Sequence, residues 1–233
     1  MRYHAVELLR LYKGLMKYRE IAELVKIPPP AIWRYITLKI MPSYERAEDI
    51  VRALTSRDVV SSILKKYVRF KENAIDISNV FNNVMLLKVL AYLAYYNFSG
   101  SNVDVVLTVE LDGVPIATLV ADLFKSRLAI SRKGIPFTSD TVYEAEYISR
   151  DPPSIVRLYL PSSDLRKNER VLIVDDIVRT GKTTATLIKL IRSIGATLIG
   201  VFSPIAVGSL WRETLRDYLD VIVTVLNIEE RIR

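Results

Sequence analysis

The segment from Val171 to Thr184 constrains the fold of this chain more than any other part of the sequence. Four apolar residues are followed by two acids, Asp175 and Asp176, and then by a short loop that contains Gly181. A continuous apolar run of this length is typical of a strand that is buried on both faces, as in a parallel sheet. In open sheets of this kind, ligands bind beyond the carboxyl ends of the strands. The segment therefore predicts an α/β fold with a ligand site at the end of this strand.

Short apolar runs alternate with helix-length stretches through the second half of the chain. The predicted strands are residues 103–109, 128–130, 155–160, 171–174, 198–202 and 221–226. The predicted helices are residues 116–124, 184–194 and 210–219. Strands that alternate with helices indicate a mostly parallel sheet with helices on both faces.

The loop after the acid pair has the groups that a phosphorylated sugar would need. The first turn of the following helix offers unpaired backbone N–H groups and the positive end of the helix dipole, which favour a phosphate. Gly181 allows close approach of the backbone, and the hydroxyls of Thr180, Thr183 and Thr184 are additional donors. The two carboxylates can accept hydrogen bonds from vicinal sugar hydroxyls.

This segment has two other interpretations. Gly181-Lys182-Thr183 resembles the end of a nucleotide-binding Walker A loop, but that motif requires another glycine where this chain has Asp176. A carboxylate there would repel the polyphosphate that such a loop surrounds. Alternatively, the two acids merely cap the end of a strand.

The positive charge of the chain is concentrated in its first third. Residues 1–75 hold 15 Lys and Arg against 8 Asp and Glu, whereas the remainder holds 18 of each, and the net charge is +7. A basic module of this kind suits a nucleic-acid phosphate backbone. A solvated helical surface is the alternative.

Residues 19–36 have the spacing of a helix-turn-helix. Ala22 is small where two helices would touch, and Ile27, Ile32 and Tyr35 fall at inward positions. Lys26 occupies a turn position that requires a left-handed backbone, where a lysine costs about 1 kcal/mol. The predicted DNA-contacting residues are Lys17, Arg19, Pro29, Pro30, Ala31, Trp33, Arg34 and Lys39.

Three alternatives stay open for this part of the chain. It could be a helical hairpin that serves in dimerisation. Trp33 could pack against the second domain instead of facing a partner. The basic module could also bind single-stranded RNA through stacking rather than a DNA groove.

Composition narrows the remaining classes. There is no cysteine and one histidine, His4, so we expect no disulfide, no metal site made by protein side chains alone and no redox cofactor. Neither a signal peptide nor a membrane-spanning segment is evident, which favours a cytoplasmic protein that does not enter membranes. A connecting helix over residues 80–96, capped by Ser78 or Asn79, places the domain boundary within residues 70–100. We expect a helix-turn-helix domain over residues 1–70, connecting helices over 71–99 and a ligand-binding domain over 100–233.

The segment 171–184 resembles the signature of type I phosphoribosyltransferases, which bind 5-phosphoribosyl-1-pyrophosphate (PRPP). The resemblance extends over residues 100–228. Thr108 to Ala117 resembles the family's pyrophosphate loop, with Glu110, Leu111, Asp112 and Gly113 as candidate contacts. Arg132-Lys133 resembles a pair found in orotate phosphoribosyltransferases.

This resemblance implies a role for each part of the segment. Asp175 and Asp176 would hold the ribose hydroxyls. Magnesium would arrive with the pyrophosphate. The 5-phosphate would bind the loop and the start of the helix, at Ile177, Val178, Arg179, Thr180, Gly181, Lys182, Thr183 and Thr184.

Two departures from the family pattern favour a sensor over a catalyst. Asp112 stands where the orotate enzymes usually have a lysine, and Glu110 precedes it; acids there would weaken pyrophosphate binding. Residues 134–146 also lack the basic, glycine-rich mobile loop of those enzymes. A catalyst must stabilise the charge that develops on the leaving group, and these residues supply no cluster of cations.

The order of the two modules is similar to archaeal transcriptional regulators of the orotate phosphoribosyltransferase-like family, and more distantly to bacterial purine repressors. The resemblance implies a homodimeric regulator that binds double-stranded DNA and senses PRPP or a nucleoside monophosphate. The alternative is a phosphoribosyltransferase enzyme, acting on orotate or a purine base, with a helical appendage.

Overall fold

The structure is a computed structural model that describes residues 1–71, 74–137, 141–150 and 153–229. The chain divides into two compact units, Met1–Leu93 and Ala94–Arg233. Each unit has buried apolar residues of its own.

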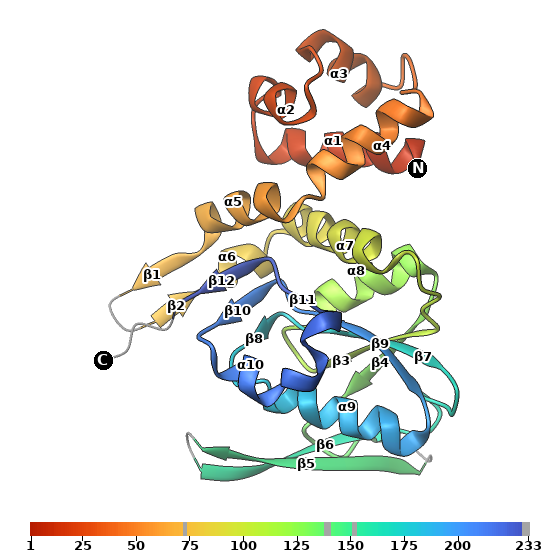
Figure 1. The fold of residues 1–233 in the computed structure, drawn as a ribbon, viewed down its shortest axis with the longest axis vertical. Helices are drawn as coiled ribbons and strands as arrows, with labels where there is room; N and C mark the ends of the chain where they lie inside the picture. Colours follow the sequence, from red (N-terminus) through yellow and green to blue (C-terminus); the bar gives the residue numbers. More distant parts are fainter. Residues whose placement is uncertain (72–73, 138–140, 151–152, 230–233) are drawn as a thin grey trace. The chain divides into compact units, whose positions relative to one another are not determined.

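The first unit is mostly helical (Figure 1). Helix α1 packs against α3 and α4, and α2 packs against α3 and α4. Amphipathic spacing of Leu8, Leu9, Ile21 and Ile32 places these residues in the core, where they are fully or almost fully buried. The elements are α1 (Arg2–Leu15), α2 (Tyr18–Val25), α3 (Pro29–Ile36), α4 (Tyr44–Leu54), α5 (Arg57–Tyr67), β1 (Arg69–Lys71), β2 (Ala74–Asp76), α6 (Ser78–Phe81) and α7 (Val84–Phe98), which continues into the second unit.

A tight turn joins α2 to α3. Lys26 has φ 52° and ψ 43°, so the left-handed conformation expected at this position is confirmed. Helix α3 begins at Pro29, in the first turn, where a missing N–H costs nothing. Ile27 and Ile32 are buried as predicted, and Ala22 and Tyr35 are half-buried.

The connecting helix begins later than predicted. Ser78 opens the short helix α6, and the chain breaks its helical course before α7. The Oδ1 atom of Asn83 accepts hydrogen bonds from the N–H groups of Met85 (3.0 Å) and Leu86 (3.3 Å). Asn83 therefore caps the long helix, and the expected cap at Ser78 or Asn79 was wrong, because a second asparagine-rich turn follows the first.

The second unit is built on two parallel sheets. The larger sheet has the order β11-β9-β7-β3-β4 and the smaller has the order β12-β10-β8. Every neighbouring pair in these two sheets is parallel, which confirms the predicted mostly parallel fold. Its elements are β3 (Val105–Val109), α8 (Val114–Phe124), β4 (Arg127–Ser131), β5 (Val142–Arg150), β6 (Pro153–Pro161), β7 (Arg170–Val174), β8 (Ile177–Val178), α9 (Lys182–Ile194), β9 (Thr197–Phe202), β10 (Ile205–Val207), α10 (Leu210–Thr214), η1 (Arg216–Val221), β11 (Ile222–Val223) and β12 (Leu226–Ile228).

Strand order makes the carboxyl ends of β3 and β7 the point at which the connections diverge, a place called the crevice below. The chain moves from β3 to β4 in one direction along the sheet and from β7 to β9 in the other. Because such crossovers are right-handed, α8 and α9 cover opposite faces, as Figure 1 shows. The loops after β3 and β7 therefore diverge at the carboxyl edge, which is where ligands bind in open sheets.

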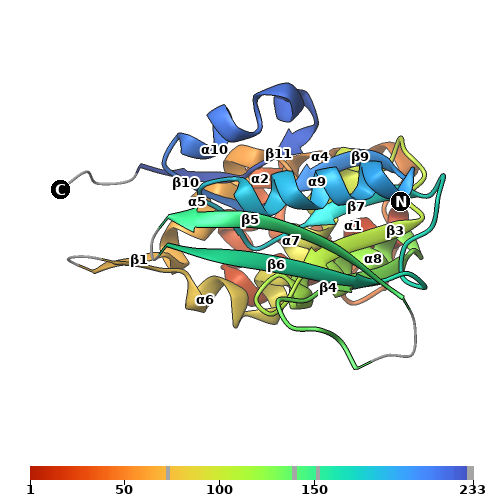
Figure 2. The same cartoon turned by 90° about the horizontal axis from the view of Figure 1, so that it is seen from below.

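Several elements differ from the prediction. The expected helix 210–219 is divided at Leu215 into α10 and η1, and the expected strand 221–226 is divided between two sheets, in β11 and β12. The short strands β1, β2, β8 and β10 were not predicted. Strand β5 was also missed, although its alternation of Tyr143, Ala145 and Tyr147 with acidic residues is a period-two signal. Figure 2 shows β5 and β6 as a long antiparallel pair.

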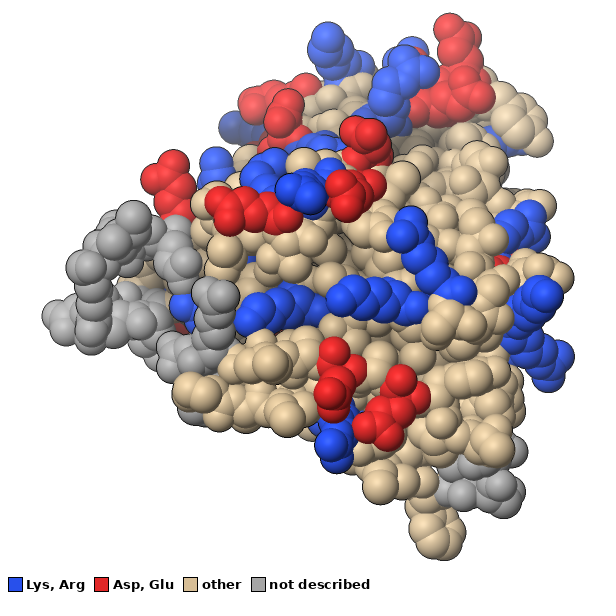
Figure 3. Space-filling view, turned by 60° about the horizontal axis from the view of Figure 1, so that its bottom comes forward, with Lys and Arg blue, Asp and Glu red and all other residues tan. Residues whose placement is uncertain are grey.

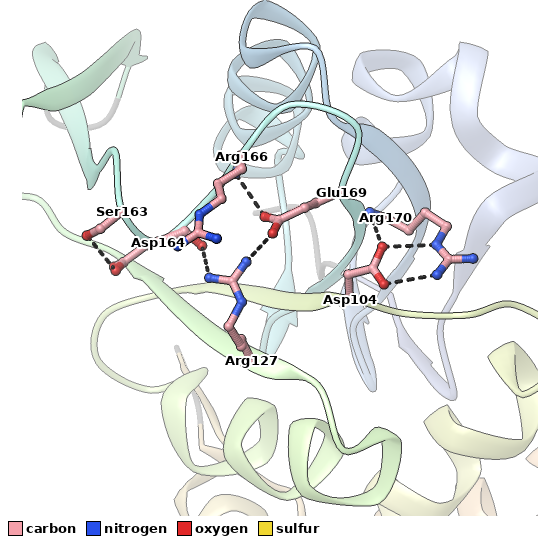
Figure 4. A network of polar contacts seen from close by, with 7 residues as sticks. All are labelled: Asp104, Arg127, Ser163, Asp164, Arg166, Glu169 and Arg170. Atoms are coloured by element: carbon pink, nitrogen blue, oxygen red, sulfur yellow. Dashed lines mark hydrogen bonds and ion pairs between the residues drawn. The ribbon is translucent and has the colours of Figure 1, made fainter.

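Ion pairs join the amino ends of the strands in the larger sheet (Figure 4). The carboxylate of Asp104, just before β3, accepts hydrogen bonds from both Nε (3.0 Å) and Nη2 (2.9 Å) of Arg170, at the start of β7. Arg127, at the start of β4, pairs with Glu169. These contacts lie at the edge of the sheet opposite the crevice and fix the register of β3, β4 and β7.

Candidate functional site

The acid pair lies directly after β7, as the sequence predicted. Asp176 is buried, with 9% of its surface exposed, and Asp175 is partly buried. The N–H of Asp175 donates to the carbonyl of Phe202 on β9 (3.0 Å), and the N–H of Asp176 donates to Oδ1 of Asp175 (3.0 Å). The backbone of the pair is therefore anchored to the sheet.

The loops after β3 and β7 touch at Gly113. A Cβ atom on this residue would lie 2.5 Å from Oγ1 of Thr108 and 3.0 Å from Oδ1 of Asp175. Only glycine fits at this distance, because real Cβ atoms do not approach neighbours so closely. The structure thus brings the predicted pyrophosphate loop, in which the Glu110–Leu111 peptide is cis, against the acid pair.

Negative charge is concentrated in this crevice. Burial and the charge of Asp176 raise the pKa of Asp175 well above its usual range, while Lys133 acts in the opposite direction. Burial raises the pKa of Asp176, and the charge of Asp112 adds to this effect. A group that donates hydrogen bonds or carries positive charge would offset this repulsion.

Strand β5 contacts the loop that leads into α9 and the start of that helix. Gly181 has φ +74° and lies against Leu215, so the position requires glycine both for its conformation and for space. Nζ of Lys182 donates to the carbonyl of Ile148 (2.7 Å), and the hydroxyls of Thr183 and Tyr147 lie 3.1 Å apart. The side chains of Lys182 and Thr183 are thus already engaged by β5.

The other predicted residues of this loop differ in exposure. Arg179 and Thr180 are exposed, whereas Val178 and Thr184 are buried and Ile177 is half-buried. Oγ1 of Thr180 accepts a hydrogen bond from the N–H of Lys182 (3.4 Å). The first turn of α9 adds backbone N–H groups, which suit an anion.

The Arg132-Lys133 pair lies beside the loop after β3. The N–H of Lys133 donates to Oε1 of Glu110 (2.9 Å), and Nη1 of Arg132 lies 3.8 Å from Oε2 of Glu110. Leu111 and Asp112 are exposed at the tip of the same loop. Parallel pairing of β3 with β4 explains this proximity, because their carboxyl ends meet at one edge.

Residues 76–230 match the family model for the phosphoribosyl transferase domain. The chain belongs to the phosphoribosyltransferase family. Its phosphoribosyltransferase domain has the type I fold.

Two kinds of curated protein resemble this phosphoribosyltransferase domain. The probable purine biosynthesis transcriptional regulator PurR of Streptococcus pneumoniae is 30% identical over 126 residues, covering 54% of this chain and 46% of the regulator. The xanthine phosphoribosyltransferase of Moorella thermoacetica is 32% identical over 161 residues, covering 68% of this chain and 79% of that enzyme. The chain thus spans about half the length of the regulators that it matches.

Solved structures show the same fold. The adenine phosphoribosyltransferase of Thermoanaerobacter pseudethanolicus superposes with a TM-score of 0.64 at 19% identity, over 72% of this chain and 99% of that one. This likeness supports the architecture of the phosphoribosyltransferase domain.

Magnesium accompanies PRPP in this family. Among the residues that the structure describes, no three acids or histidines are grouped so as to hold a metal ion. Magnesium is commonly bound by one or two carboxylates and completed by substrate phosphates. Burial, together with the charge of Asp176, raises the pKa of Asp175. Asp175 and Asp176 therefore fit an ion that phosphates bring, and such an ion would neutralise a bound pyrophosphate.

A hollow of about 400 Å³ shares only Arg132 with the candidate site. Its lining is Leu128, Ile130, Arg132, Pro136, Phe137, Pro161 and Asp164. On the face in Figure 3, basic and acidic side chains are interspersed across uncharged surface.

The predicted DNA-contacting residues lie on α2, α3 and the turns next to them. Trp33 is 43% exposed and Nζ of Lys39 lies 4.3 Å from the centroid of its ring. Lys17, Arg19, Pro30 and Arg34 are exposed, while Pro29 and Ala31 are half-buried.

None of the helices in the described ranges is long and apolar enough to cross a bilayer.

Sequence reasoning missed the role of β5 in the site. Tyr147 and Ile148 contact the start of α9, but neither residue belongs to a motif. The alternation of polar and apolar residues in β5 could have identified a strand, but not the helix that it touches.

Proposed function

We propose that this chain is a DNA-binding transcriptional regulator whose phosphoribosyltransferase domain senses a ribose 5-phosphate ligand, either PRPP or a nucleotide. The observation that carries the proposal is the pair α2–α3, in which a left-handed Lys26 joins two short helices and the second exposes Trp33 and Arg34. A second helix of this kind enters the major groove in helix-turn-helix proteins.

The charge distribution and the relatives support the same function. The whole positive excess of the chain lies in residues 1–75. Neutralising DNA phosphates with such residues releases counterions and supplies affinity. Curated purine regulators are also among the relatives of the domain. We infer a homodimer, because two-fold symmetry would match two half-sites about one helical turn apart.

The ligand would bind across the crevice between β3 and β7. Its phosphate would lie at the start of α9, and its hydroxyls would donate to Asp175 and Asp176. Ligand binding can regulate DNA affinity only if the DNA-competent and incompetent states bind the ligand with different affinities.

Selection of bound fragments from random duplex DNA, with and without PRPP, tests the regulator directly. An enriched sequence is expected, and its enrichment should change with the ligand. Competition with single-stranded RNA separates the two nucleic acids. Recovery of random sequences under all conditions would contradict the proposal.

Arg34→Ala sharpens the DNA test. If Arg34 reads a base edge, its loss should weaken binding by about 1–3 kcal/mol and relax the preference at one position. The matched control is Arg52→Ala, on the exposed surface of α4. Equal, sequence-independent weakening by both variants would mean that Arg34 contributes only charge.

Asp175→Asn combined with Asp176→Asn tests the ligand site. The double variant keeps the shape of both side chains but removes the two carboxylates that accept from the sugar. We expect ribose phosphate binding to disappear in calorimetry while DNA affinity without ligand is retained. Unchanged calorimetric binding would remove the acid pair from the site.

A second candidate function is phosphoribosyl transfer to a purine base. It is favoured by the match to a xanthine phosphoribosyltransferase of which the chain covers 79%. Incubation of the full chain with PRPP, magnesium and candidate bases distinguishes the two. Sustained pyrophosphate release would establish the enzyme.

A further inference from the structure

The exposed face of α3 carries few polar groups. Four residues at helical spacing are exposed on this helix and its C-cap, namely Pro30, Trp33, Arg34 and Thr37. The hydroxyl of Thr37 donates to the carbonyl of Trp33 (2.8 Å), so the helix itself already engages it. The guanidinium of Arg34 and the indole of Trp33 are therefore the main groups that this face offers to a partner.

The indole of Trp33 is held in place although 43% of the residue is exposed. Nζ of Lys39 lies 4.3 Å from the centroid of its ring, and the N–H of Lys39 donates to the carbonyl of Arg34 (3.0 Å). Nε and Nη2 of Arg10, on α1, donate to the carbonyl of Ile36 (3.0 and 2.9 Å). A side chain that is already held loses little conformational freedom on binding, so this ring suits a specific contact.

The charge around this face suits a nucleic acid. Residues 17–40 hold five Lys and Arg against two Asp and Glu. The basic residues Lys17, Arg19, Lys26, Arg34 and Lys39 are all exposed. Cations that surround an apolar ring complement duplex DNA, which presents phosphates along its backbone and thymine methyl groups in its major groove.

The side chains of this face limit the bases that it can read. In the major groove, adenine is read by Asn or Gln, cytosine by Asp or Glu, guanine by Arg or Lys, and the methyl group of thymine by an apolar side chain. The four exposed residues of α3 and its C-cap include neither a carboxamide nor a carboxylate. Arg34 therefore fits guanine, and the ring of Trp33 fits the methyl group of thymine.

We propose that Trp33 reads the methyl group of a thymine that lies next to a guanine in each half-site of the DNA. The inference rests on the proposed function and names the bases that the regulator recognises. Trp33 and Arg34 are consecutive on one face, so the two bases are neighbours. Burying one methyl group contributes about 0.8 kcal/mol, which corresponds to about fourfold in affinity.

Replacement of thymine by deoxyuridine tests this contact without a change in the protein. Uracil pairs with adenine as thymine does and keeps the same carbonyl acceptor, but it lacks the methyl group. The probes are the duplex enriched by selection and versions of it in which deoxyuridine replaces one thymine at a time. Fluorescence anisotropy with the full chain is expected to show a loss of about fourfold at one position of each half-site.

Trp33→Ala assigns the contact to its residue. The variant should bind the thymine duplex more weakly, and its affinities for the thymine and uracil duplexes should become equal. Trp33→Phe retains an apolar ring and is expected to retain a preference for thymine. Tyr44→Ala is the matched control, because Tyr44 is 69% exposed and the guanidinium carbon of Arg2 lies 5.6 Å from its ring centroid, outside α3. The control should keep the wild-type ratio of affinities.

The outcomes separate this inference from the proposed function. If the wild type binds a selected duplex but no replacement of thymine changes its affinity, the thymine contact is overturned and DNA binding stands. A preference for thymine that survives in Trp33→Ala would also overturn it. Tighter binding of single-stranded RNA, which lacks the methyl group, would contradict both. If no duplex sequence is enriched, the proposed function fails, and the thymine contact fails with it.

Discussion

At the scale of single residues, the crevice combines features that reduce stability with features that suit a ligand. The carboxylates of Asp175 and Asp176 repel each other where burial shields them from water, and Asp112 adds to the negative charge. Such sites are retained when the charges are needed for binding, because functional groups commonly lower the stability of the unliganded protein.

Asp175→Asn should stabilise the unliganded protein at neutral pH. The pKa of Asp175 is raised in the folded state, so the folded protein holds this proton more tightly than the unfolded chain does. Stability therefore falls as the pH rises above about 4, the usual value for an aspartic acid, towards the raised pKa. The variant loses this dependence. Melting temperatures from pH 4 to pH 7 should show no gain at the acidic end and a gain at the neutral end; a loss at pH 7 would contradict the interpretation.

Gly113→Ala should disturb the contact between the two loops. The new Cβ would lie 2.5 Å from Oγ1 of the fully buried Thr108, so either loop must move. We expect a loss of about 1–3 kcal/mol in the free energy of unfolding, together with weaker ligand binding. Gly134→Ala is the control, because nothing lies within 4 Å of its Cβ and a change below about 0.5 kcal/mol is expected. Equal denaturation curves for the two variants would show that the loops do not need this approach.

At the scale of elements, the two ends of the strands in the larger sheet carry different kinds of charged residues. The carboxyl ends of its strands carry the closely spaced acids Asp175 and Asp176, whereas paired charges join β3, β4 and β7 at their amino ends (Figure 4). Strand β5 adds a third support, because it fixes Lys182 at the start of α9. In the sequence, residues 134–146 differ from the mobile loop of the orotate enzymes; residues from Val142 onward form a strand instead.

Asp104→Asn should change stability with the opposite pH dependence to Asp175→Asn. Hydrogen bonds from Arg170 lower the pKa of Asp104 to about 2. This stabilisation is present above about pH 4 and is lost as the pH falls towards 2. Acid denaturation of the variant and the wild type should therefore differ at pH 5 and converge near pH 2. Asp122→Asn is the control, since its ion pair with Lys125 joins two side chains that are more than 70% exposed. A difference that persists at pH 2 would require another cause.

At the scale of the whole molecule, the two units have separate cores, and each contains one of the two tryptophans. Trp33 lies in the first unit, and Trp211, 3% exposed, lies in the second. In the proposed regulator, one unit would bind DNA while the other would respond to a small molecule.

Ribose 5-phosphate should stabilise the second unit. In a Trp33→Phe variant, fluorescence reports on Trp211 alone, and a ligand at 100 times its Kd should add about 2.7 kcal/mol to the stability that it reports. Adding Asp175→Asn and Asp176→Asn should abolish the shift. A shift that survives the loss of both acids would place the ligand elsewhere.

The features that depend on local order along the chain can be predicted from the amino-acid sequence alone. The apolar run before Asp175, the alternation of strands and helices and the left-handed turn at Lys26 follow from periodicity and backbone preference, which neighbouring residues encode. The sequence therefore predicted the parallel sheet and the place of the acid pair at the end of a strand, whereas the pyrophosphate loop was expected from a family resemblance alone. The predicted first residues of α7 and α9 were less accurate, because several polar residues near the start of each helix can act as its cap.

Only the tertiary structure decided which of these features meet. Gly113 lies against Asp175, and Glu110 contacts Lys133, because β3 is placed between β7 and β4 in the sheet. Strand β5 reaches α9 through Ile148 and Tyr147 for a similar reason. Contacts of this kind join residues that are far apart in the chain. They form only because strand order and packing bring those residues together, and no local pattern of residues encodes strand order.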